Sequence, residues 1–176
     1  MKVLSIDIGL VSLGWSTWNS LDGKVRFGIC NVRDAVPKKS RKDYCLIAKT
    51  FIDKRPDLFQ NTQVVLLERQ MQAGMKQFAT ALRAFLWHRS KVYLISPITV
   101  KRYFGSSTGN YKANKKASVA LFIEIASTTS NLLFAQFKKK QQTDVADAYL
   151  QMFWYIYKHK LSKACGMPVT ALAALN

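Results

Sequence analysis

The sequence contains few acidic residues. Only 10 of its 176 residues are Asp or Glu, against 27 Lys or Arg, so the formal net charge is +17. Charged residues make up 21% of the chain, slightly below the roughly 25% of average soluble proteins, so acids are missing more than bases are added. A protein this cationic attracts polyanions, of which nucleic acid is the commonest. The composition argues against an ordinary neutral metabolic enzyme.

Cysteine and histidine are also scarce, and long hydrophobic runs are absent. Three dispersed cysteines and two histidines form no C-x-x-C pair or zinc constellation. No window approaches the ~18 apolar residues that cross a bilayer, and an apolar pattern that starts at Val3 leaves no room for a signal peptide. We therefore expect an intracellular protein with no membrane partner. The basic run at 37–42 matches a nuclear import patch, but also a solvated helix start or a phosphate contact.

Hydrophobic periodicity predicts one α/β domain over residues 1–176, with a core at about 2–158 and a tail at 160–176. The expected strands are 3–9, 14–19, 25–32, 63–68 and 92–95. The expected helices are 41–54, 74–89, a short helix from Pro97, 115–126, and 143–158 with Thr143 as its N-cap. Three meandering strands followed by alternating helices and strands predict a five-stranded mixed sheet flanked by helices.

Four acids stand where a surface charge is not expected. Asp7 lies inside an apolar strand, and Glu68 ends the apolar run 64–67. Asp144 and Asp147 are three residues apart, on one side of a helix. Burying a carboxylate is costly unless it is paired or binds a metal. Oxygen ligands without His or Cys favour Mg²⁺ or Mn²⁺, and two such ions about 4 Å apart can hydrolyse a phosphodiester.

Each of these acids also has a plainer explanation. Asp144 and Asp147 could be early-turn acids favoured by the helix dipole. Asp7 could be a strand-end turn residue, and Glu68 could pair with Arg69 or face solvent. Four such positions in so acid-poor a chain favour one shared site. The other acids lie in turns or on polar helix faces: Asp22, Asp34, Asp43, Asp53, Asp57 and Glu124.

Three motifs occur in order along the chain: I-D-I-G-x-x-x-x-G-W at 6–15, L-L-E-R-Q at 66–70 and D-V-A-D-A at 144–148. Together they resemble the RuvC-type Holliday junction resolvases of the RNase H-like superfamily. The Glu-Arg-Gln form is most similar to the poxvirus and yeast mitochondrial branches, and the compact size and early start are most similar to the poxvirus branch. The resemblance covers about residues 2–158. It implies an RNase H-like fold and a metal-dependent endonuclease that resolves four-way DNA junctions by paired symmetric nicks, leaving 5′-phosphate and 3′-hydroxyl ends.

The resemblance also implies site residues and partners. Asp7, Glu68, Asp144 and Asp147 match the metal-binding acids of the family, which would hold two Mg²⁺ ions per site, with Mn²⁺ able to substitute. It implies a homodimer, since a junction is cut at two symmetric points, and no small-molecule cofactor. A poxviral source would place the protein in the host cytoplasm. For the catalytic lysine, the K-x-x-V pattern favours Lys116, while Lys115 and Lys112 remain alternatives.

Basic residues gather in three clusters that suit contacts with the phosphates of several DNA arms. They are Lys38, Lys39, Arg41 and Lys42; Lys101, Arg102, Lys112, Lys115 and Lys116; and Lys138, Lys139 and Lys140. Tyr103, Phe104 and Tyr111 flank the second cluster and could stack on unpaired bases, although burial is expected for Phe104. An apolar stripe at helical spacing fits either a dimer interface or a plain core face: Met71, Met75, Phe78, Leu82 and Phe85.

Other functions fit part of the pattern. Another RNase H-like nuclease, acting on RNA or an RNA–DNA hybrid, would use the same acids. A non-catalytic basic DNA-binding protein would explain the charge but not the four acids. An actin-like kinase also begins with an Asp-x-Gly strand, but it needs a second such domain that this chain has no room for.

Overall fold

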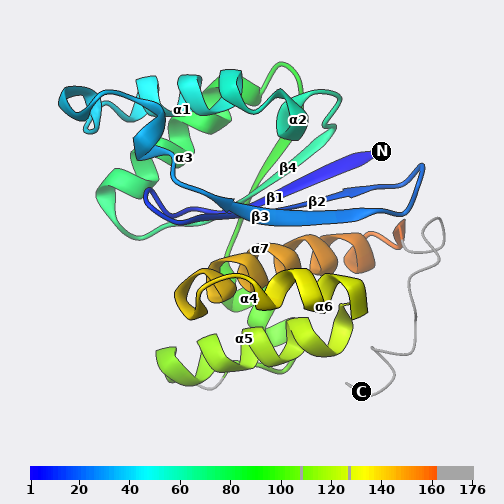
Figure 1. The fold of residues 1–176 in the computed structure, drawn as a ribbon. Helices are drawn as coiled ribbons and strands as arrows, with labels where there is room; N and C mark the ends of the chain where they lie inside the picture. Colours follow the sequence, from blue (N-terminus) through cyan, green and yellow to red (C-terminus); the bar gives the residue numbers. More distant parts are fainter. Residues whose placement is uncertain (108, 127, 162–176) are drawn as a thin grey trace.

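The computed structural model describes residues 1–107, 109–126 and 128–161, and Figure 1 shows a central sheet with helices on both faces. The strands are β1 Lys2–Asp7, β2 Leu13–Asn19, β3 Val25–Cys30, β4 Val64–Glu68 and β5 Lys91–Ile95. They form one sheet in the order β3-β2-β1-β4-β5. The β1–β2 and β2–β3 pairs are antiparallel, whereas β1–β4 and β4–β5 are parallel. The predicted α/β fold with a mixed five-stranded sheet is confirmed.

Strands β1 and β4 lie inside the sheet and are covered on both faces. Val3, Leu4 and Ile6 of β1 are fully buried, as is β4 from Val64 to Leu67. Burial on both faces explains why each strand is a continuous apolar run and not an alternating one. Ser5, a polar residue inside β1, is buried and accepts a hydrogen bond from Nε2 of Gln151 on the helix that follows residue 138, at 3.0 Å. The two acids, Asp7 and Glu68, lie instead at the ends of their strands.

Three helices cover one face of the sheet: α1 Tyr44–Lys54, α2 Pro56–Phe59 and α3 Ala73–Leu86 (Figure 1). Asp43 caps α1, because its side chain accepts a hydrogen bond from the backbone N–H of Leu46 at 2.9 Å. Pro56 ends α1 and opens α2, since proline fits the first position of a helix but not its interior. Side chains of α1 and α3 pack with β1 and β4 in one hydrophobic core.

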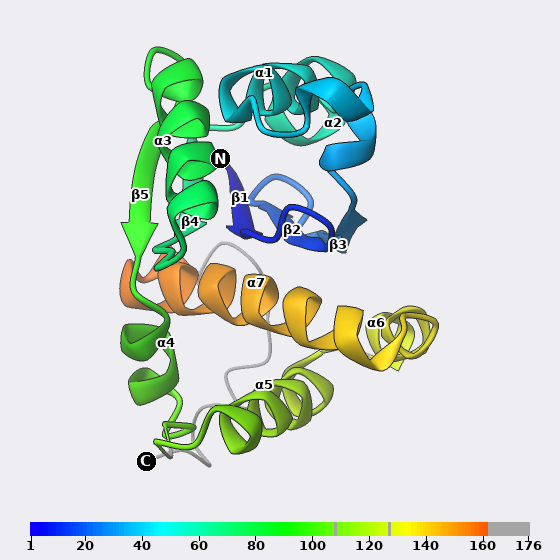
Figure 2. The ribbon, with the colours of Figure 1, turned by 90° about the vertical axis from the view of Figure 1, so that its left-hand side faces the viewer.

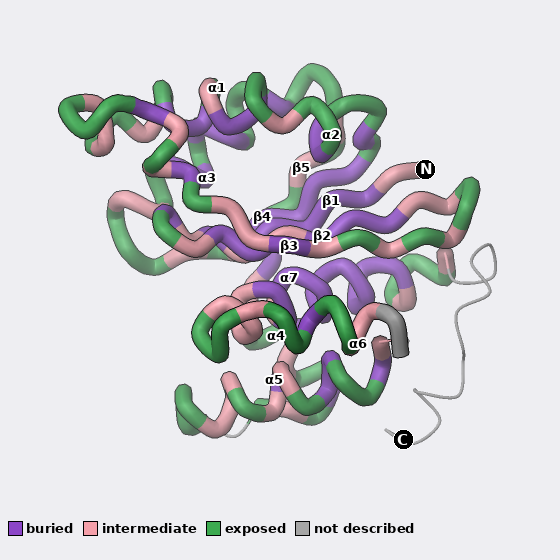
Figure 3. Tube along the Cα trace, in the orientation of Figure 1, coloured by how far each residue is buried: buried purple, intermediate pink, exposed green. Residues whose placement is uncertain are grey.

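The opposite face is covered by α7 Lys139–Lys158, which lies between the sheet and α5 Tyr111–Ile125 (Figures 1 and 2). Two shorter helices, α4 Pro97–Tyr103 and α6 Thr128–Ala135, flank it. From Val145 to Ile156 almost every residue of α7 is buried, and Figure 3 shows this helix and the adjacent strands as the buried centre. This part of α7 is apolar nearly all round because it packs on the sheet and on α5 at once.

The prediction of Thr143 as the N-cap of the last helix is wrong. Helix α7 begins four residues earlier, at Lys139, and the backbone N–H of Lys138 donates to Oε1 of Gln141 at 3.1 Å. The hydroxyl of Thr143 instead donates to the carbonyl of Lys140 at 2.7 Å. No acid lies in the first turn of α7, so the helix dipole does not explain Asp144 or Asp147.

Two further elements were not expected from the sequence, the short helix α2 and helix α6. Two 3₁₀ turns also shape the segment before α1, η1 Arg33–Ala35 and η2 Lys38–Ser40. The tail expected at 160–176 falls almost wholly outside the described residues. Among the helices that are described, none has the length and apolar character needed to cross a membrane.

Candidate active site

Asp7 and Glu68 lie next to each other at the carboxyl ends of two parallel strands. The register pairs Ile6 of β1 with Leu67 of β4, so the two acids that follow occupy the same edge of the sheet. Their carboxyl groups lie close enough to perturb each other's pKa. Two such carboxyls can share a hydrogen bond only if one is protonated, because two charged carboxylates have no donor.

Gly14 allows α7 to approach the sheet at the same edge. It pairs with Asp7 across the β1–β2 ladder. A Cβ atom on Gly14 would lie 2.1 Å from the backbone oxygen of Asp144 and 2.4 Å from its carbonyl carbon, so no larger residue fits there. The helix backbone therefore rests directly on the strand, which places Asp144 and Asp147 beside the strand-end acids.

Asp144 is held from two sides. The hydroxyl of Ser12, in the loop between β1 and β2, donates to its Oδ2 at 2.5 Å. Its Oδ1 lies 3.9 Å from Nζ of Lys115 on α5, and the same Nζ lies 3.4 Å from Oγ1 of Thr143. The carboxylate thus connects the loop before β2, the helix α7 and the helix α5.

The acids repel one another inside a protein environment. The pKa of Asp7 lies well above its ordinary value of 3.8, first because the group is buried and then because Glu68 is close. Burial also raises the pKa of Glu68 and of Asp147. Lys101 and Lys115 act in the opposite direction on both groups, but they do not outweigh burial. Such a group of carboxyls is stabilised either by protons or by a bound cation.

Lys115 is a cation in this site. Burial lowers its pKa, but its contact with Tyr111 and the negative charges of Asp144 and Asp147 outweigh that effect and raise the pKa overall. Its Nζ lies 5.1 Å from the centre of the Tyr111 ring, a distance at which a cation is attracted to the ring face. The aromatic ring and the acids together fix the position of this lysine.

The four acids open into a cleft of about 640 Å³ between the strand ends, α5 and α7. Arg33, Arg69, Lys101, Lys115 and Lys140 contribute positive charge to its lining. Acids at the floor with cations around them suit a polyanion that must approach a metal. The cleft is open to solvent.

The donor atoms fit a hard divalent cation. All four acids offer carboxylate oxygens, which Mg²⁺ and Mn²⁺ prefer. The side chains do not already form a closed cage, because in the described part of the chain no three His, Cys, Asp or Glu side chains are grouped as a metal site.

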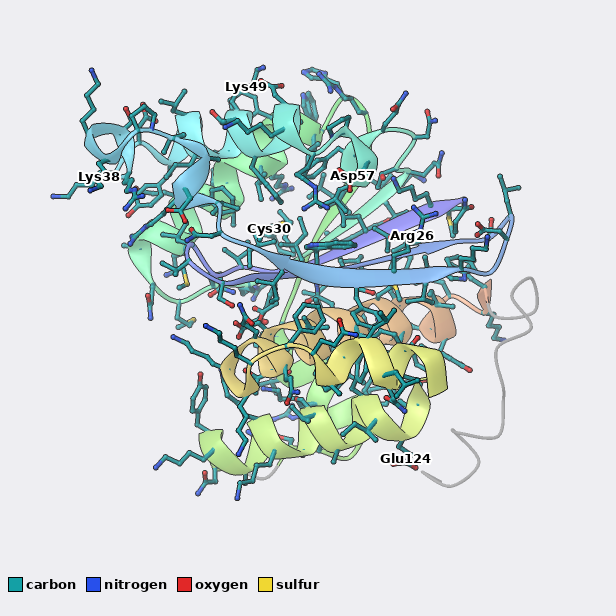
Figure 4. All side chains as sticks on the ribbon, in the orientation of Figure 1. Arg26, Cys30, Lys38, Lys49, Asp57 and Glu124 are labelled. Atoms are coloured by element: carbon teal, nitrogen blue, oxygen red, sulfur yellow. The ribbon has the colours of Figure 1, made fainter. Side chains whose placement is uncertain are left out.

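The structure brings together some of the predicted basic residues and not others. Lys101, Lys115 and Lys140 line the cleft. Lys112 and Lys116 are exposed and lie outside its lining, so the geometry favours Lys115 over Lys116 as the lysine of the site. The remaining predicted DNA contacts lie outside the cleft lining. Arg41 is half-buried, and the others are exposed: Lys38, Lys39, Lys42, Arg102, Lys138 and Lys139. Figure 4 shows Lys38 at the outer end of the segment before α1.

Sequence reasoning missed three residues that the fold brings to the cleft. Ser12 gave no signal, because one serine in a loop is unremarkable until its distant partner is known. Arg33 reaches the cleft from η1, where its backbone N–H donates to the carbonyl of Leu10 at 3.2 Å. Arg69 follows Glu68 directly, and the L-L-E-R-Q motif could have identified it.

The other six acids were expected in turns or on polar helix faces, and the structure places them in surface ion pairs, caps, turns or exposed positions. Asp34 pairs with Arg41 at 2.8 Å, Asp53 with Lys49 at 2.5 Å, and Asp57 with Arg55 at 2.7 Å. Asp22 accepts from the backbone N–H of Lys24 at 3.0 Å, and Asp43 caps α1. Figure 4 shows Glu124 on α5, far from the cleft.

The fold is that of known junction resolvases. Fowlpox virus resolvase, solved in complex with its substrate Holliday junction DNA, aligns with a TM-score of 0.64 at 16% identity, over 90% of this chain and 99% of that chain. T. thermophilus RuvC in complex with a Holliday junction substrate aligns with a TM-score of 0.53 at 15% identity, over 90% of this chain and 96% of that one.

The sequence matches a family model but no individual curated protein. No curated protein sequence is similar enough to match this chain. The family model described as "Poxvirus A22 protein" matches residues 1–159, a range that holds all four acids, Lys115 and every described element up to the end of α7. The chain therefore belongs to the poxvirus A22 protein family.

Proposed function

We propose that this chain is a metal-dependent endonuclease that resolves four-way (Holliday) DNA junctions by paired nicks. One observation carries the proposal: four carboxylates and Lys115 converge in one cleft of a chain with a net charge of +17. A non-catalytic DNA-binding protein has no use for buried acids that repel phosphate. The fold shared with fowlpox virus resolvase and RuvC, both solved with Holliday junction DNA, supports the choice of substrate.

The acidic side chains would bind the metal ions, and the basic side chains would bind DNA. Asp7, Glu68, Asp144 and Asp147 would hold two Mg²⁺ ions, or Mn²⁺ in their place. Bound there, the ions would activate water and stabilise the leaving oxygen, giving 5′-phosphate and 3′-hydroxyl ends. Lys115 would contact the scissile phosphate, and the cations around the cleft would hold the backbone on either side.

A cleavage assay on two substrates, a four-way junction and an RNA–DNA hybrid, tests the proposal. Wild-type protein should nick a four-way junction symmetrically in Mg²⁺ and should be inactive in EDTA. Asp144→Asn should bind the junction without cutting it, while Asp53→Asn, which removes an acid from a surface ion pair, should cut like wild type. Cutting by Asp144→Asn, or cutting that persists in EDTA, would overturn the proposal. Faster cutting of an RNA–DNA hybrid than of the junction would favour the alternative RNase H-like nuclease.

Lys115→Ala is expected to slow single-turnover cutting by about 10²–10³-fold, the usual cost of removing one group that stabilises developing charge. Lys116→Ala and Lys112→Ala should cut at close to the wild-type rate, because both residues are exposed and neither lines the cleft. Rates measured at saturating protein separate this effect from weaker DNA binding. A slow Lys116→Ala beside a fast Lys115→Ala would reverse the assignment.

We also propose that the protein acts as a homodimer joined along the β5 edge of the sheet. Phe78 and Leu82 of the apolar stripe on α3 are buried in the protomer's own core, so that part of the stripe serves as core. β5 is an edge strand at the outer margin of the molecule in Figure 2, and unpaired edges invite association. Four large apolar side chains are exposed beside it: Phe85, Trp87, Tyr93 and Leu94.

Leu94→Glu is expected to weaken the dimer by about 30-fold or more, the effect of losing roughly 2 kcal/mol at an interface centre. A charge placed on this edge would have to be buried when two copies meet. Leu132→Glu, on the exposed side of α6, is the matched control and should leave the dimer intact. Sedimentation velocity over a concentration series measures both. If Leu94→Glu stayed as dimeric as wild type, the interface would lie elsewhere.

Localisation in the cytoplasm of the host cell fits a family of poxvirus proteins, and we include it in the proposal. Microscopy of the tagged protein in infected cells tests it. The exposed basic residues Lys38, Lys39 and Lys42 would then serve DNA contact and not nuclear import. Accumulation in the nucleus that depends on residues 37–42 would contradict this part.

A further inference from the structure

The loop between β1 and β2 folds back onto the acids of α7. A Cβ atom on Gly9 would lie 2.1 Å from the backbone oxygen of Ser12, so glycine is required for this tight fold-back. The loop then leads into Leu13 and Gly14, where the strand touches α7. Two glycines thus bring Ser12 to the start of the buried part of α7.

Ser12 fixes one oxygen of Asp144 and leaves the other for the cleft. Its hydroxyl donates to Oδ2 at 2.5 Å, across 132 positions of sequence. Oδ1 lies 3.4 Å from Oγ1 of Thr143 and 3.9 Å from Nζ of Lys115. Because the Asp144 side chain is only 13% exposed, it has little room to rotate away. The two oxygens therefore have different partners and a defined orientation.

A hydroxyl suits this position better than a basic side chain would. Lysine or arginine at the same place would also hold the carboxylate, but its positive charge would compete with a divalent cation. A neutral donor orients the carboxylate and leaves its full negative charge. Hydrogen-bond partners behind metal ligands commonly act in this way, and changing them costs about 10–100-fold in metal affinity.

We propose that Ser12 is a positioning residue that presents Oδ1 of Asp144 to a divalent metal while holding Oδ2 itself. It acts through Asp144 and does not touch DNA. The inference rests on the proposed function only in taking Asp144 as a metal ligand. Ser12 lies in the loop before β2 and contacts Oδ2 of Asp144, whereas Lys115 lies near Oδ1. The two residues would therefore orient the Asp144 carboxylate together.

Binding of Mn²⁺ to the full chain without DNA, followed by isothermal titration calorimetry, tests the proposal directly. Ser12→Ala should weaken Mn²⁺ binding by about 10–100-fold, and Ser12→Thr, which keeps the hydroxyl, should restore it. Ser16→Ala is the matched control, because Ser16 is a nearby serine of β2 whose hydroxyl contacts Sδ of Met152 on α7 at 3.3 Å and none of the four acids. The control should bind Mn²⁺ like wild type.

Cutting and junction binding give the second readout. Ser12→Ala should need a higher Mg²⁺ concentration for half-maximal cutting, while its affinity for the junction in EDTA stays unchanged. Equal Mn²⁺ affinity in Ser12→Ala and wild type would overturn the inference, and so would a loss that Ser12→Thr does not restore. A wild-type protein that cuts no junction but binds Mn²⁺ with this dependence on Ser12 would sink the proposed function and leave the inference standing.

Discussion

Asp7→Asn is expected to abolish DNA cutting and, at the same time, to raise the melting temperature of the metal-free protein. Asparagine keeps the shape of the side chain and removes a charge that is buried beside Glu68. The loss of cutting should exceed the roughly 10–100-fold effect of altering a partner behind a metal ligand. The gain in stability should be visible as a rise of about 2–4 °C for each kcal/mol of charge burial that is removed.

The buried carboxyl of Asp7 should make the stability of the metal-free protein depend on pH. Because the pKa of its carboxyl is raised in the folded state, that state binds a proton at a higher pH than the unfolded chain does. Stability of the metal-free wild type should therefore increase as pH falls from the raised pKa toward 3.8. The difference in melting temperature between Asp7→Asn and wild type should shrink over the same interval. A difference that is zero at pH 7 would show that Asp7 is not buried as a charge.

Gly14→Ala is expected to reduce cutting by at least about 100-fold although residue 14 carries no functional group. The new Cβ would overlap the backbone of Asp144, and backbone atoms cannot move aside as a flexible side chain can. Helix α7 must shift away from the sheet, and a displacement of about 1 Å in a catalytic group can cost about 100-fold in rate. The variant should also be less stable, by about 1–3 kcal/mol, as in other overpacked cores.

Gly28→Ala separates the two effects of Gly14→Ala. A Cβ on Gly28 would meet the ring of Trp15 at 2.8 Å, on the side of the sheet away from α7. This variant should lose stability but keep cutting at temperatures where it is folded. Melting curves and single-turnover rates of both variants make the comparison. Equal loss of cutting in the two would mean that general destabilisation, and not the position of α7, explains the result.

The parts that the sequence predicted well depend on local patterns. The strands that carry Asp7 and Glu68 are continuous apolar runs, and an acid at the end of such a run is visible without knowing the fold. Because β1 and β4 are neighbouring parallel strands, their carboxyl ends lie at the same edge of the sheet, and the two acids come together there. The start of α7 was missed because its first turn, Lys139–Gln142, is entirely polar and shows no helical periodicity.

The choice among lysines depends on the rotation of a helix, which the sequence leaves open. Asn110 caps α5 by accepting from the backbone N–H of Lys112 at 2.9 Å and of Ala113 at 3.2 Å, so the helix starts four residues before the predicted Lys115. Successive helical residues point about 100° apart. Only one of the adjacent residues Lys115 and Lys116 can therefore face the cleft. Packing of α5 on α7 decides that it is Lys115.

Helix α7 supplies two of the four acids and much of one hydrophobic core, and it is the last helix of the described chain. During translation, β1 and β4 emerge from the ribosome long before residues 139–158 do. A nascent chain therefore carries Asp7 and Glu68 without their partners, and one face of its sheet is bare. Cutting would therefore have to wait until α7 has been synthesised, and a premature stop before residue 139 should produce a fragment that lacks two of the four acids and cannot cut.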